Sequence, residues 1–213
     1  MIEKYRHISF DLDGTLIHTV ASYRHALVPR VVAEIGGKIK EPRSIDKFWF
    51  EPNRDKIIVN DFHIADPGKF WDLFRKLDVP VERYKHTSAY ADAESAIRKL
   101  KEMGKIISII TGAPHEIAQM EIARLNGAPH DYYFSITDNK YNAKPDPRSL
   151  NFVMTELGVG RDDTVYIGNS TEDARFAKNA GVDFIFLERK EHDFDLKDYV
   201  LNTIHSLDQL FVK

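Results

Sequence analysis

Two aspartates separated by one residue follow an apolar run near the start of the chain. The run is Ile8-Ser9-Phe10, and the acids are Asp11 and Asp13. Side chains two residues apart share one side of an extended chain, so the two carboxylates face the same way. Such a pair usually holds a cation or divides the roles of nucleophile and acid, because neighbouring carboxylates repel one another. We therefore expect a catalytic or cation site at the carboxyl end of a first strand, where ligands bind in open α/β sheets.

A hydroxyl group ends a second apolar run. Residues 105–110 predict a buried strand, which Thr111 follows directly, and Pro114 suits the start of a new helix. A hydroxyl group and free backbone N–H groups at a helix N-terminus are suited to binding phosphate. Thr111 is therefore a candidate catalytic residue, and Gly112 and Ala113 are candidates for binding substrate.

A lysine precedes a proline-rich turn. Lys144 begins the run Lys144-Pro145-Asp146-Pro147, in which Asp146 can cap a helix that starts at Pro147. The prolines restrict the backbone, so the ammonium group is held in place. A compact cation in a fixed position is suited to neutralising the charge of phosphate and carboxylate groups.

An amide and a carboxylate follow the strand expected at residues 164–167. They are Asn169 and Asp173, and Thr171 between them is a candidate cap for the next helix. Both side chains carry oxygen atoms at the expected end of this strand, and the amide of Asn169 brings no formal charge.

These groups are separated by alternating strand and helix patterns. Apolar periodicity predicts helices over 92–103 and 147–157, and a strand over 132–137. Further strands are expected over 182–187 and 199–201, and Ser206 is a candidate cap for a last helix. The fold class is therefore α/β, a Rossmann-like and mostly parallel sheet with helices on both faces. The charged segment 188–195 is predicted to be a loop without a chemical role.

Residues 17–88 interrupt this alternation with a pattern of short helices rich in aromatic side chains. We expect Ser22 to cap a short helix through Val28, with Pro29 opening or kinking the next turn, and Asp66 to cap a helix that begins at Pro67. The aromatic residues predict a hydrophobic core, with a lid over the active site as the alternative. Four basic residues are expected to be ordinary solvated charges, with a role in reaching the far end of a substrate as the alternative: Arg24, Lys47, Arg54 and Lys56.

Composition restricts the function further. The chain of 213 residues contains no cysteine, which excludes thiolate chemistry, and its net charge of -3 provides no electrostatic footprint for nucleic acid. No run is long and apolar enough to span a bilayer, and no secretory signal pattern is found, so the cytoplasm is the expected location. The histidines show no ligand spacing, and His18 and His115 lie nearest to the candidate residues.

Taken together, the four motifs resemble those of the haloacid dehalogenase superfamily, in its phosphoglycolate phosphatase-like branch. The first is Asp11-Leu12-Asp13-Gly14-Thr15-Leu16, and Thr111, Lys144 and the segment 168–173 follow in the superfamily's order. The resemblance implies a core domain from 1–16 and 89–213, and a small helical cap domain over 17–88 that sets substrate choice. One departure is clear, because Asn169 stands where this superfamily commonly carries an aspartate.

The resemblance also implies a mechanism. Asp11 would attack phosphorus to form an aspartyl-phosphate, and Asp13 would protonate the leaving oxygen and later activate water. Thr111 and Lys144 would hold the phosphoryl group. Mg²⁺ would be held by Asp11, by the backbone carbonyl of Asp13 and by Asn169, with Asp173 supporting the metal's surroundings. The alternative is that Asp173 or Glu172 binds the metal directly in place of Asn169.

The expected activity is Mg-dependent hydrolysis of a small phosphorylated metabolite. A phosphomutase and a phosphonate hydrolase remain alternatives on the same core, and a binding protein for phosphorylated ligands is a third. Neither the substrate nor the oligomeric state follows from the sequence.

Overall fold

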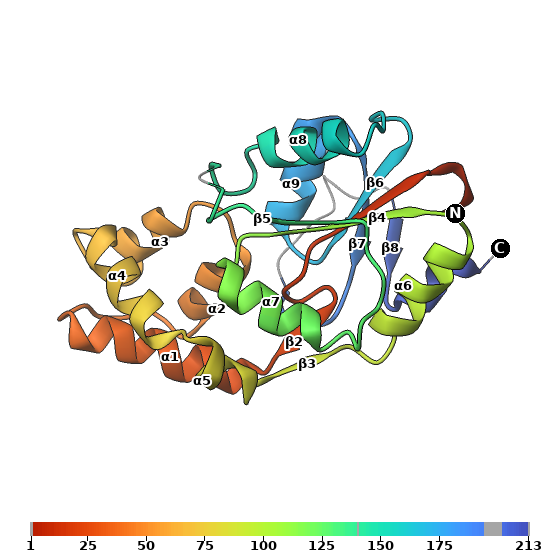
Figure 1. Cartoon of the computed structure of the whole chain (residues 1–213). Helices are drawn as coiled ribbons and strands as arrows, with labels where there is room; N and C mark the ends of the chain where they lie inside the picture. The colour runs from red at the N-terminus through yellow and green to blue at the C-terminus, as the bar shows by residue number, and fades with distance from the viewer. Residues whose placement is uncertain (1, 140, 194–201, 213) are drawn as a thin grey trace. The chain divides into compact units, whose positions relative to one another are not determined.

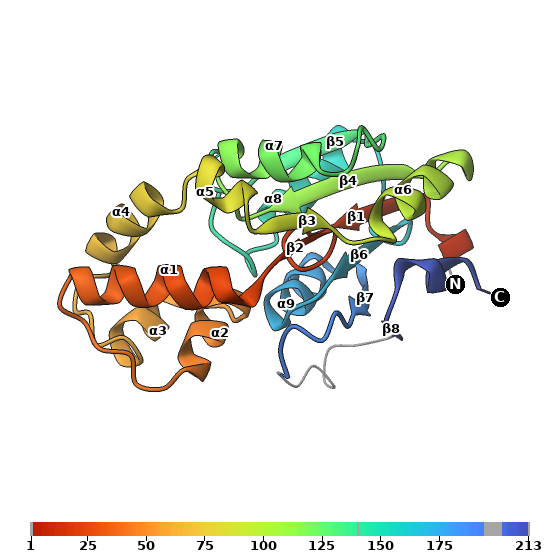
Figure 2. The same cartoon turned by 90° about the horizontal axis from the view of Figure 1, so that it is seen from below.

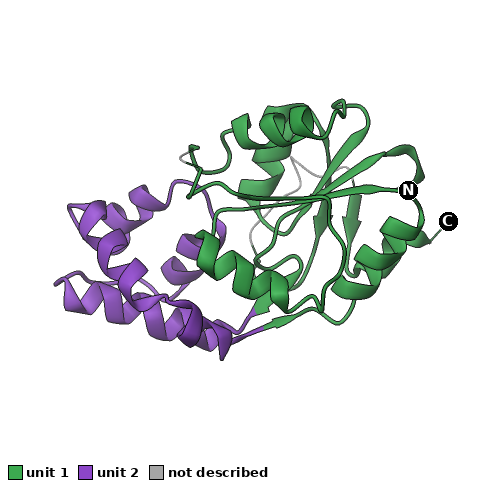
Figure 3. Cartoon of the chain, in the orientation of Figure 1, with its two compact units in different colours: residues 1–18, 88–213 green, residues 19–87 purple. Residues whose placement is uncertain are grey.

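A computed structural model describes residues 2–139, 141–193 and 202–212 of the chain. It separates into two compact units, shown in Figure 3. The core unit comprises Met1–His18 and Ser88–Lys213, and the helical unit comprises Thr19–Thr87.

The core unit is built on a sheet of six parallel strands in the order β5-β4-β1-β6-β7-β8 (Figure 1). The strands are β1 (His7–Phe10), β4 (Ile106–Thr111), β5 (Tyr132–Ser135), β6 (Thr164–Gly168), β7 (Asp183–Leu187) and β8 (Asn202–Ile204). Phe10 of β1 is in register with Ile109 of β4 on one side and with Ile167 of β6 on the other. The chain builds the β4 side of β1 first and then crosses to the β6 side. This change of direction is a topological switch point, where open α/β sheets bind ligands.

Apolar side chains cover both faces of this sheet. Ile8 and Phe10 belong to one buried cluster, whereas Ile110 and Tyr166 belong to another on the opposite face. The strands are therefore apolar on both sides, as parallel strands covered by helices must be. One face carries α6 (Ala93–Glu102), α7 (His115–Ala123) and the 3₁₀ helix η3 (Leu207–Phe211), and the other carries α8 (Arg148–Glu156) and α9 (Thr171–Ala180) (Figure 1). The predicted α/β fold class is confirmed.

A short 3₁₀ helix and two short strands are separate from the six-stranded sheet. A 3₁₀ helix, η1, spans Ile2–Lys4 before the first strand. The strands β2 (Ile17–Thr19) and β3 (Thr87–Ala89) lie side by side as a separate two-stranded sheet (Figure 2).

Helix caps agree with the sequence at some positions and differ at others. The helix Ala21–Glu34 has Val20 rather than Ser22 at its N-cap, and the N-cap of α8 is Pro147, although Asp146 accepts a bond from the N–H of Arg148. Asp66 caps its helix through a bond from the N–H of Gly68, and Ser206 forms the capping box of η3. The predicted cap Thr171 is wrong, because the hydroxyl oxygen of Ser170 accepts the bond from the N–H of Asp173. Both residues carry a suitable hydroxyl group, so residue type alone did not distinguish them.

The helical unit contains α1 (Ala21–Glu34), α2 (Arg43–Phe50), α3 (Arg54–Asn60), α4 (Pro67–Leu77) and α5 (Pro80–Tyr84). The predicted end of a short helix at Val28 is wrong, and Pro29 does not open a new helix, because α1 runs through both residues without interruption. A proline inside a helix removes one backbone hydrogen bond. Here Val28, Val31 and Val32 on the same helix are buried, and their packing opposes that cost.

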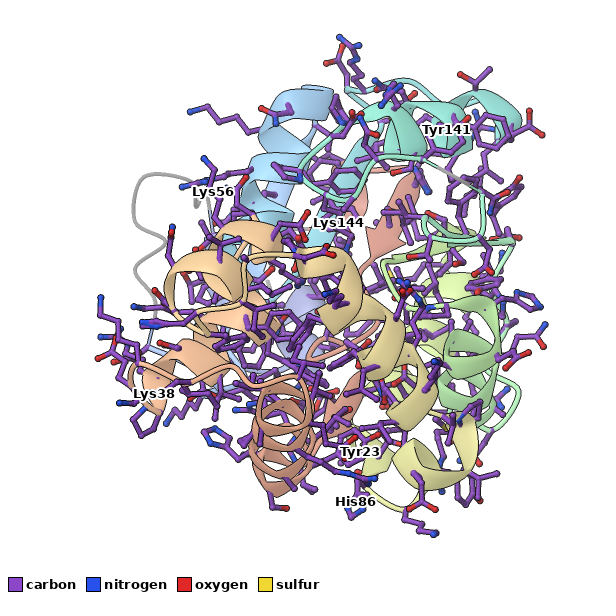
Figure 4. All side chains as sticks on the ribbon, turned by 90° about the vertical axis from the view of Figure 1, so that its left-hand side faces the viewer. Tyr23, Lys38, Lys56, His86, Tyr141 and Lys144 are labelled. Atoms are coloured by element: carbon purple, nitrogen blue, oxygen red, sulfur yellow. The ribbon has the colours of Figure 1, made fainter. Side chains whose placement is uncertain are left out.

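An aromatic cluster forms the core of the helical unit. The rings of Phe48 and Phe70 lie 5.1 Å apart, and those of Phe70 and Phe74 lie 5.7 Å apart. Phe62 is fully buried in the same cluster. These aromatic side chains form a hydrophobic core, as their spacing predicted. Tyr23 stacks on His86 at 4.9 Å at another position in the unit (Figure 4).

Three of the four basic candidates in this unit are bound within it, and the most exposed of the three, Lys47, donates to Glu41 at 3.1 Å. Arg24 is 4% exposed and donates to Asp46 at 2.7 Å, so its prediction as a solvated charge is wrong. Arg54 donates to the backbone carbonyl groups of Phe48 and Trp49. Ion pairing and capping of carbonyl groups explain why these cations lie inside the unit.

The strand expected at 199–201 lies outside the described residues, and β8 follows it directly. In the part of the chain that the structure describes, every helix is too short or too polar to cross a membrane.

Candidate active site

The ends of three adjacent strands carry three of the predicted groups. Asp11 follows β1, Thr111 is the last residue of β4, and Asn169 follows β6. Their carboxyl ends meet at one edge of the sheet, because β1 is parallel to both neighbouring strands. The local sequence explains the placement, since each strand is an apolar run that stops at a glycine or a polar residue.

Lys144 lies between two carboxylates at this edge. Its Nζ atom donates to Oδ1 of Asp11 at 2.6 Å and to Oδ1 of Asp173 at 2.9 Å. All three residues are at most 7% exposed. The lysine is supplied by the loop before α8 (Figure 4), and Asp173 by the first turn of α9. Charged groups are rarely buried unless they are paired, so this triad is a specific arrangement.

Burial and charge act in opposite directions on the protonation of this triad. Burial and the Asp173 carboxylate raise the pKa of Asp11, while the Lys144 ammonium group lowers it, and the net shift is upward. Burial lowers the pKa of Lys144, but Asp11 and Asp173 outweigh it and raise that pKa well above its usual value. Lys144 is therefore a permanent cation at this site.

Both carboxylate oxygen atoms of Asp173 accept hydrogen bonds. Oδ1 accepts from Lys144, and Oδ2 accepts from the hydroxyl of Ser170 at 2.7 Å and from the N–H of Asn169 at 3.2 Å. Asp173 therefore orients the lysine and the loop after β6.

Asn169 packs directly against the turn that follows the two aspartates. Gly14 has a φ of +76°, and a Cβ atom there would lie 2.1 Å from Nδ2 of Asn169. Only glycine satisfies both the left-handed backbone and this close approach. The Nδ2 atom is buried and has no hydrogen-bond partner among the described residues. Asp13, immediately before this glycine, is half-buried.

The hydroxyl group of Thr111 is oriented by its own loop. The N–H of Ala113 donates to Oγ1 of Thr111 at 3.0 Å. The oxygen thus accepts from the backbone, and its own proton remains for donation to a ligand. The Ala113 N–H, predicted to bind substrate, makes this internal bond. The carbonyl of Gly112 accepts from the hydroxyl of Thr137 at 2.7 Å.

Two residues at the site were missed by the sequence reasoning. The hydroxyl group of Thr15 donates to Oδ2 of Asp11 at 3.1 Å. Tyr166 is fully buried, with its ring centroid 5.4 Å from Nζ of Lys144. The four-residue spacing from Asp11 to Thr15 was an available signal, whereas nothing in the sequence marks Tyr166 apart from other strand residues.

The two histidines nearest to the motifs lie elsewhere in the core unit. His18 lies 2.5 Å from Glu191 through its Nδ1 atom. The N–H of His115 donates to Asp138, and its ring lies near Tyr133. Neither is among the groups that contact Asp11 or Lys144.

Comparison with known proteins agrees with this architecture. The haloacid dehalogenase-like hydrolase family matches residues 5–181. A phosphoglycolate phosphatase from Cereibacter sphaeroides is 31% identical over 196 residues, which is 87% of this chain and 86% of that protein. One from Pseudomonas putida is 26% identical over 191 residues, or 85% of this chain and 69% of that protein. The crystal structure of a haloacid dehalogenase-like hydrolase from Bacteroides fragilis has a TM-score of 0.83 at 22% identity, covering 98% of this chain and 100% of that chain.

The chain therefore belongs to the haloacid dehalogenase-like hydrolase family. Within it, the chain lies in the phosphoglycolate phosphatase-like branch and is an enzyme of the phosphatase type.

Proposed function

We propose that this enzyme hydrolyses a small phosphate monoester in two steps, with Asp11 as the nucleophile. The observation that carries the proposal is the contact of Lys144 with Asp11 and Asp173 at the carboxyl ends of the strands. A buried cation beside a buried carboxylate offsets the repulsion between that carboxylate and an incoming phosphate.

In the first step, a carboxylate oxygen of Asp11 attacks phosphorus, and the bond from phosphorus to the ester oxygen breaks. Asp13, in its protonated form, gives its proton to the departing oxygen. Asp13 is half-buried and can reach water, whereas the nucleophile Asp11 is buried. The products of this step are an alcohol and an aspartyl-phosphate.

In the second step, the Asp13 carboxylate takes a proton from water, and the water oxygen attacks phosphorus. The bond between phosphorus and Asp11 then breaks, which restores both carboxyl groups and releases inorganic phosphate. Thr111 donates its hydroxyl proton to a phosphoryl oxygen, because its own oxygen already accepts from Ala113. Lys144 stays charged throughout and holds Asp11 in place.

The residues present also fit a magnesium ion. Mg²⁺ is usually held by one or two carboxylates together with water and phosphate oxygens. Asp11 would supply a carboxylate, and the backbone of Asp13 would supply a carbonyl group. Asn169 would supply a side-chain amide, whose Nδ2 atom is buried without a partner among the described residues. Turning this amide over would present its oxygen at that position. When bound, the ion would offset the charge that Asp11 shares with the phosphoryl oxygens.

Asn169 suits the role of ligand better than Asp173, because its Nδ2 position is buried without a partner among the described residues, whereas Oδ2 of Asp173 alone accepts two hydrogen bonds. Among the described residues, no three Asp, Glu or His side chains gather as a metal site. The proposed ion would therefore rest on few protein ligands, and we assign Asp173 to positioning.

The relatives suggest the substrate class. Proteins about 30% identical to this chain are named phosphoglycolate phosphatases, so small phosphorylated carboxylic acids are the first esters to test. A phosphomutase would instead convert a sugar phosphate into its isomer. A phosphonate hydrolase would form a Schiff base that borohydride traps.

The test is phosphate release from an aryl phosphate and from 2-phosphoglycolate across a Mg²⁺ titration, with Asp11→Asn as the control. We expect release that depends on Mg²⁺ and disappears in the variant. Release that persists in Asp11→Asn would contradict the proposed nucleophile. Isomerisation without release would favour the mutase, and tight binding of the ester without turnover would favour a binding protein.

A further inference from the structure

The segment after β7 binds the loop after β1, which carries Asp11 and Asp13, and the loop after β6, which carries Asn169. Arg189 donates through Nη2 to the carbonyl oxygen of Thr15 at 2.9 Å. The Nε2–H of His192 donates to the carbonyl oxygen of Asn169 at 2.6 Å. All of these residues belong to the core unit. The sequence predicts that this charged segment is a loop without a chemical role, and hydrogen bonds alone do not test that prediction.

Arg189 is itself held firmly. Its two terminal nitrogens each donate to one carboxylate oxygen of Asp92 at 2.8 Å. The guanidinium group also lies 3.9 Å from the ring centroid of Tyr90. Its side chain is 7% exposed and that of Asp92 is 11% exposed. A bidentate pair with an aromatic stacking partner fixes both the position and the plane of an arginine.

Asp92 is also bound by two residues at the start of η3. Its Oδ2 atom accepts from the hydroxyl of Ser206 at 2.9 Å and from the N–H of Leu207 at 2.8 Å. The carboxylate therefore joins the start of α6, the start of η3 and Arg189. The guanidinium group is thus attached to secondary structure through Asp92 and to the turn through the bond from Nη2 to Thr15.

Thr15 connects this fixed group to the nucleophile. It is fully buried, its carbonyl accepts from Arg189, and its hydroxyl donates to Oδ2 of Asp11 at 3.1 Å. The same turn is closed by bonds from the N–H groups of Leu16 and Ile17 to the carbonyl of Leu12. A shift of Thr15 would therefore move the hydroxyl that orients the Asp11 carboxylate.

The end of the turn is tied to the same segment. Oε1 of Glu191 lies 2.5 Å from Nδ1 of His18 and accepts from the hydroxyl of Tyr90. Two residues of the segment therefore hold the stretch from Thr15 to His18.

We propose that Arg189 is a positioning residue, which holds Thr15 in place and, through the Thr15 hydroxyl, orients the Asp11 carboxylate for attack. The inference rests on the proposed role of Asp11 as nucleophile. The reaction rate depends steeply on where groups near the reacting centre lie, because a displacement of about 1 Å can lower the rate roughly a hundredfold.

The test compares Arg189→Lys with Lys101→Met. A lysine keeps the charge opposite Asp92 but cannot bind both Asp92 oxygens and Thr15 together. Lys101 also pairs with a carboxylate of the core unit, Asp131, at 2.6 Å, but makes no contact with the turn of residues 11–17. Arg189→Lys is expected to lower kcat roughly tenfold to a hundredfold with KM nearly unchanged. Lys101→Met is expected to retain the wild-type kcat.

A second variant shows whether the effect passes through Thr15. Thr15→Val removes the hydroxyl and keeps the shape of the side chain. In this background Arg189→Lys should lower kcat by much less than it does in the wild type, because the connection is already broken. Independent losses that multiply in the double variant would overturn the proposed route.

Hydrogen exchange gives a readout that needs no activity. Arg189→Lys should speed amide exchange in a peptide spanning residues 11–18, and Lys101→Met should not. Unchanged exchange in that peptide, or equal kcat in the two variants, would overturn the positioning role. A wild type that hydrolyses no phosphate ester would defeat the proposed function instead, while the exchange measurement would still decide whether Arg189 orders the turn.

Discussion

The side chain of Lys144 bonds to that of Asp11 at 2.6 Å, across 133 residues of sequence, and the same ammonium group bonds to Asp173 at 2.9 Å. Removing the lysine would leave two buried carboxylates facing one another. Breaking a buried pair in this way costs about 3–5 kcal/mol. Lys144→Met should therefore lower the free energy of unfolding by that amount, as measured by urea denaturation.

The double variant Lys144→Met/Asp173→Asn provides the control for this prediction. It removes one of the two negative charges, so part of the lost stability should return. A double variant that is no more stable than Lys144→Met would show that repulsion between Asp11 and Asp173 is not the cause.

Gly14 offers a test of the contact with Asn169. Alanine at this position should lose activity, because its Cβ atom would lie 2.1 Å from the Asn169 amide, and it should lose about 1–2 kcal/mol through its left-handed backbone. Gly104 has a similar φ of +73°, but no atom lies within 4 Å of its Cβ position. Gly104→Ala should therefore show the same loss of stability with normal kcat. Equal activity in the two variants would contradict the importance of this contact.

Asn169→Asp tests the proposed metal ligand. A negative charge near a cation is worth a few kcal/mol at about 4 Å, so the Mg²⁺ concentration for half-maximal activity should fall roughly tenfold or more. The thermal stabilisation by Mg²⁺ without substrate should shift to lower concentrations in parallel. An unchanged or higher requirement for Mg²⁺ in both measurements would exclude Asn169 as a ligand.

Much of this site follows from local sequence. An apolar run that stops at a glycine or a polar residue predicted the ends of β1, β4 and β6, and the alternation of strands and helices predicted that these ends meet. The strand ends therefore point to Asp11, and the proline-rich turn points to Lys144, from the sequence alone. The 2.6 Å bond between Lys144 and Asp11 shows that the two predicted residues lie in contact.

The remaining features depend on contacts between distant segments. Neither Arg189 nor Tyr166 lies in a motif or at an informative spacing, because each acts through residues far away in the chain. The choice between Asn169 and Asp173 as ligand needed the hydrogen bonds that occupy Asp173. The Pro29 and Thr171 predictions failed for a related reason, since packing and cap geometry overrode residue preference.

A buried histidine links stability to pH. His7 is fully buried between Thr164 and Ser108, and burial lowers its pKa from about 6.5 to about 4. Between pH 6.5 and pH 4 the unfolded chain binds a proton that the folded protein does not, so stability falls as the pH falls through this window. The loss attributable to His7 is at most about 3 kcal/mol.

The measurement is urea denaturation at pH 7 and pH 4.5 for the wild type and His7→Gln. A glutamine does not titrate, so the difference in unfolding free energy between the two pH values should be smaller in the variant. An equal difference in both proteins would assign the acid sensitivity to other groups.

The central claim is that Asp11 carries the phosphoryl group between the two steps. Its most direct test is to mix the enzyme with a phosphate ester that it hydrolyses, quench in acid within milliseconds, and locate any added phosphoryl group by peptide mass spectrometry. We predict a phosphoryl group on Asp11 that hydroxylamine removes and that is absent from Asp11→Asn. Rapid phosphate release with no phosphorylated enzyme, or with the group on another residue, would contradict the mechanism.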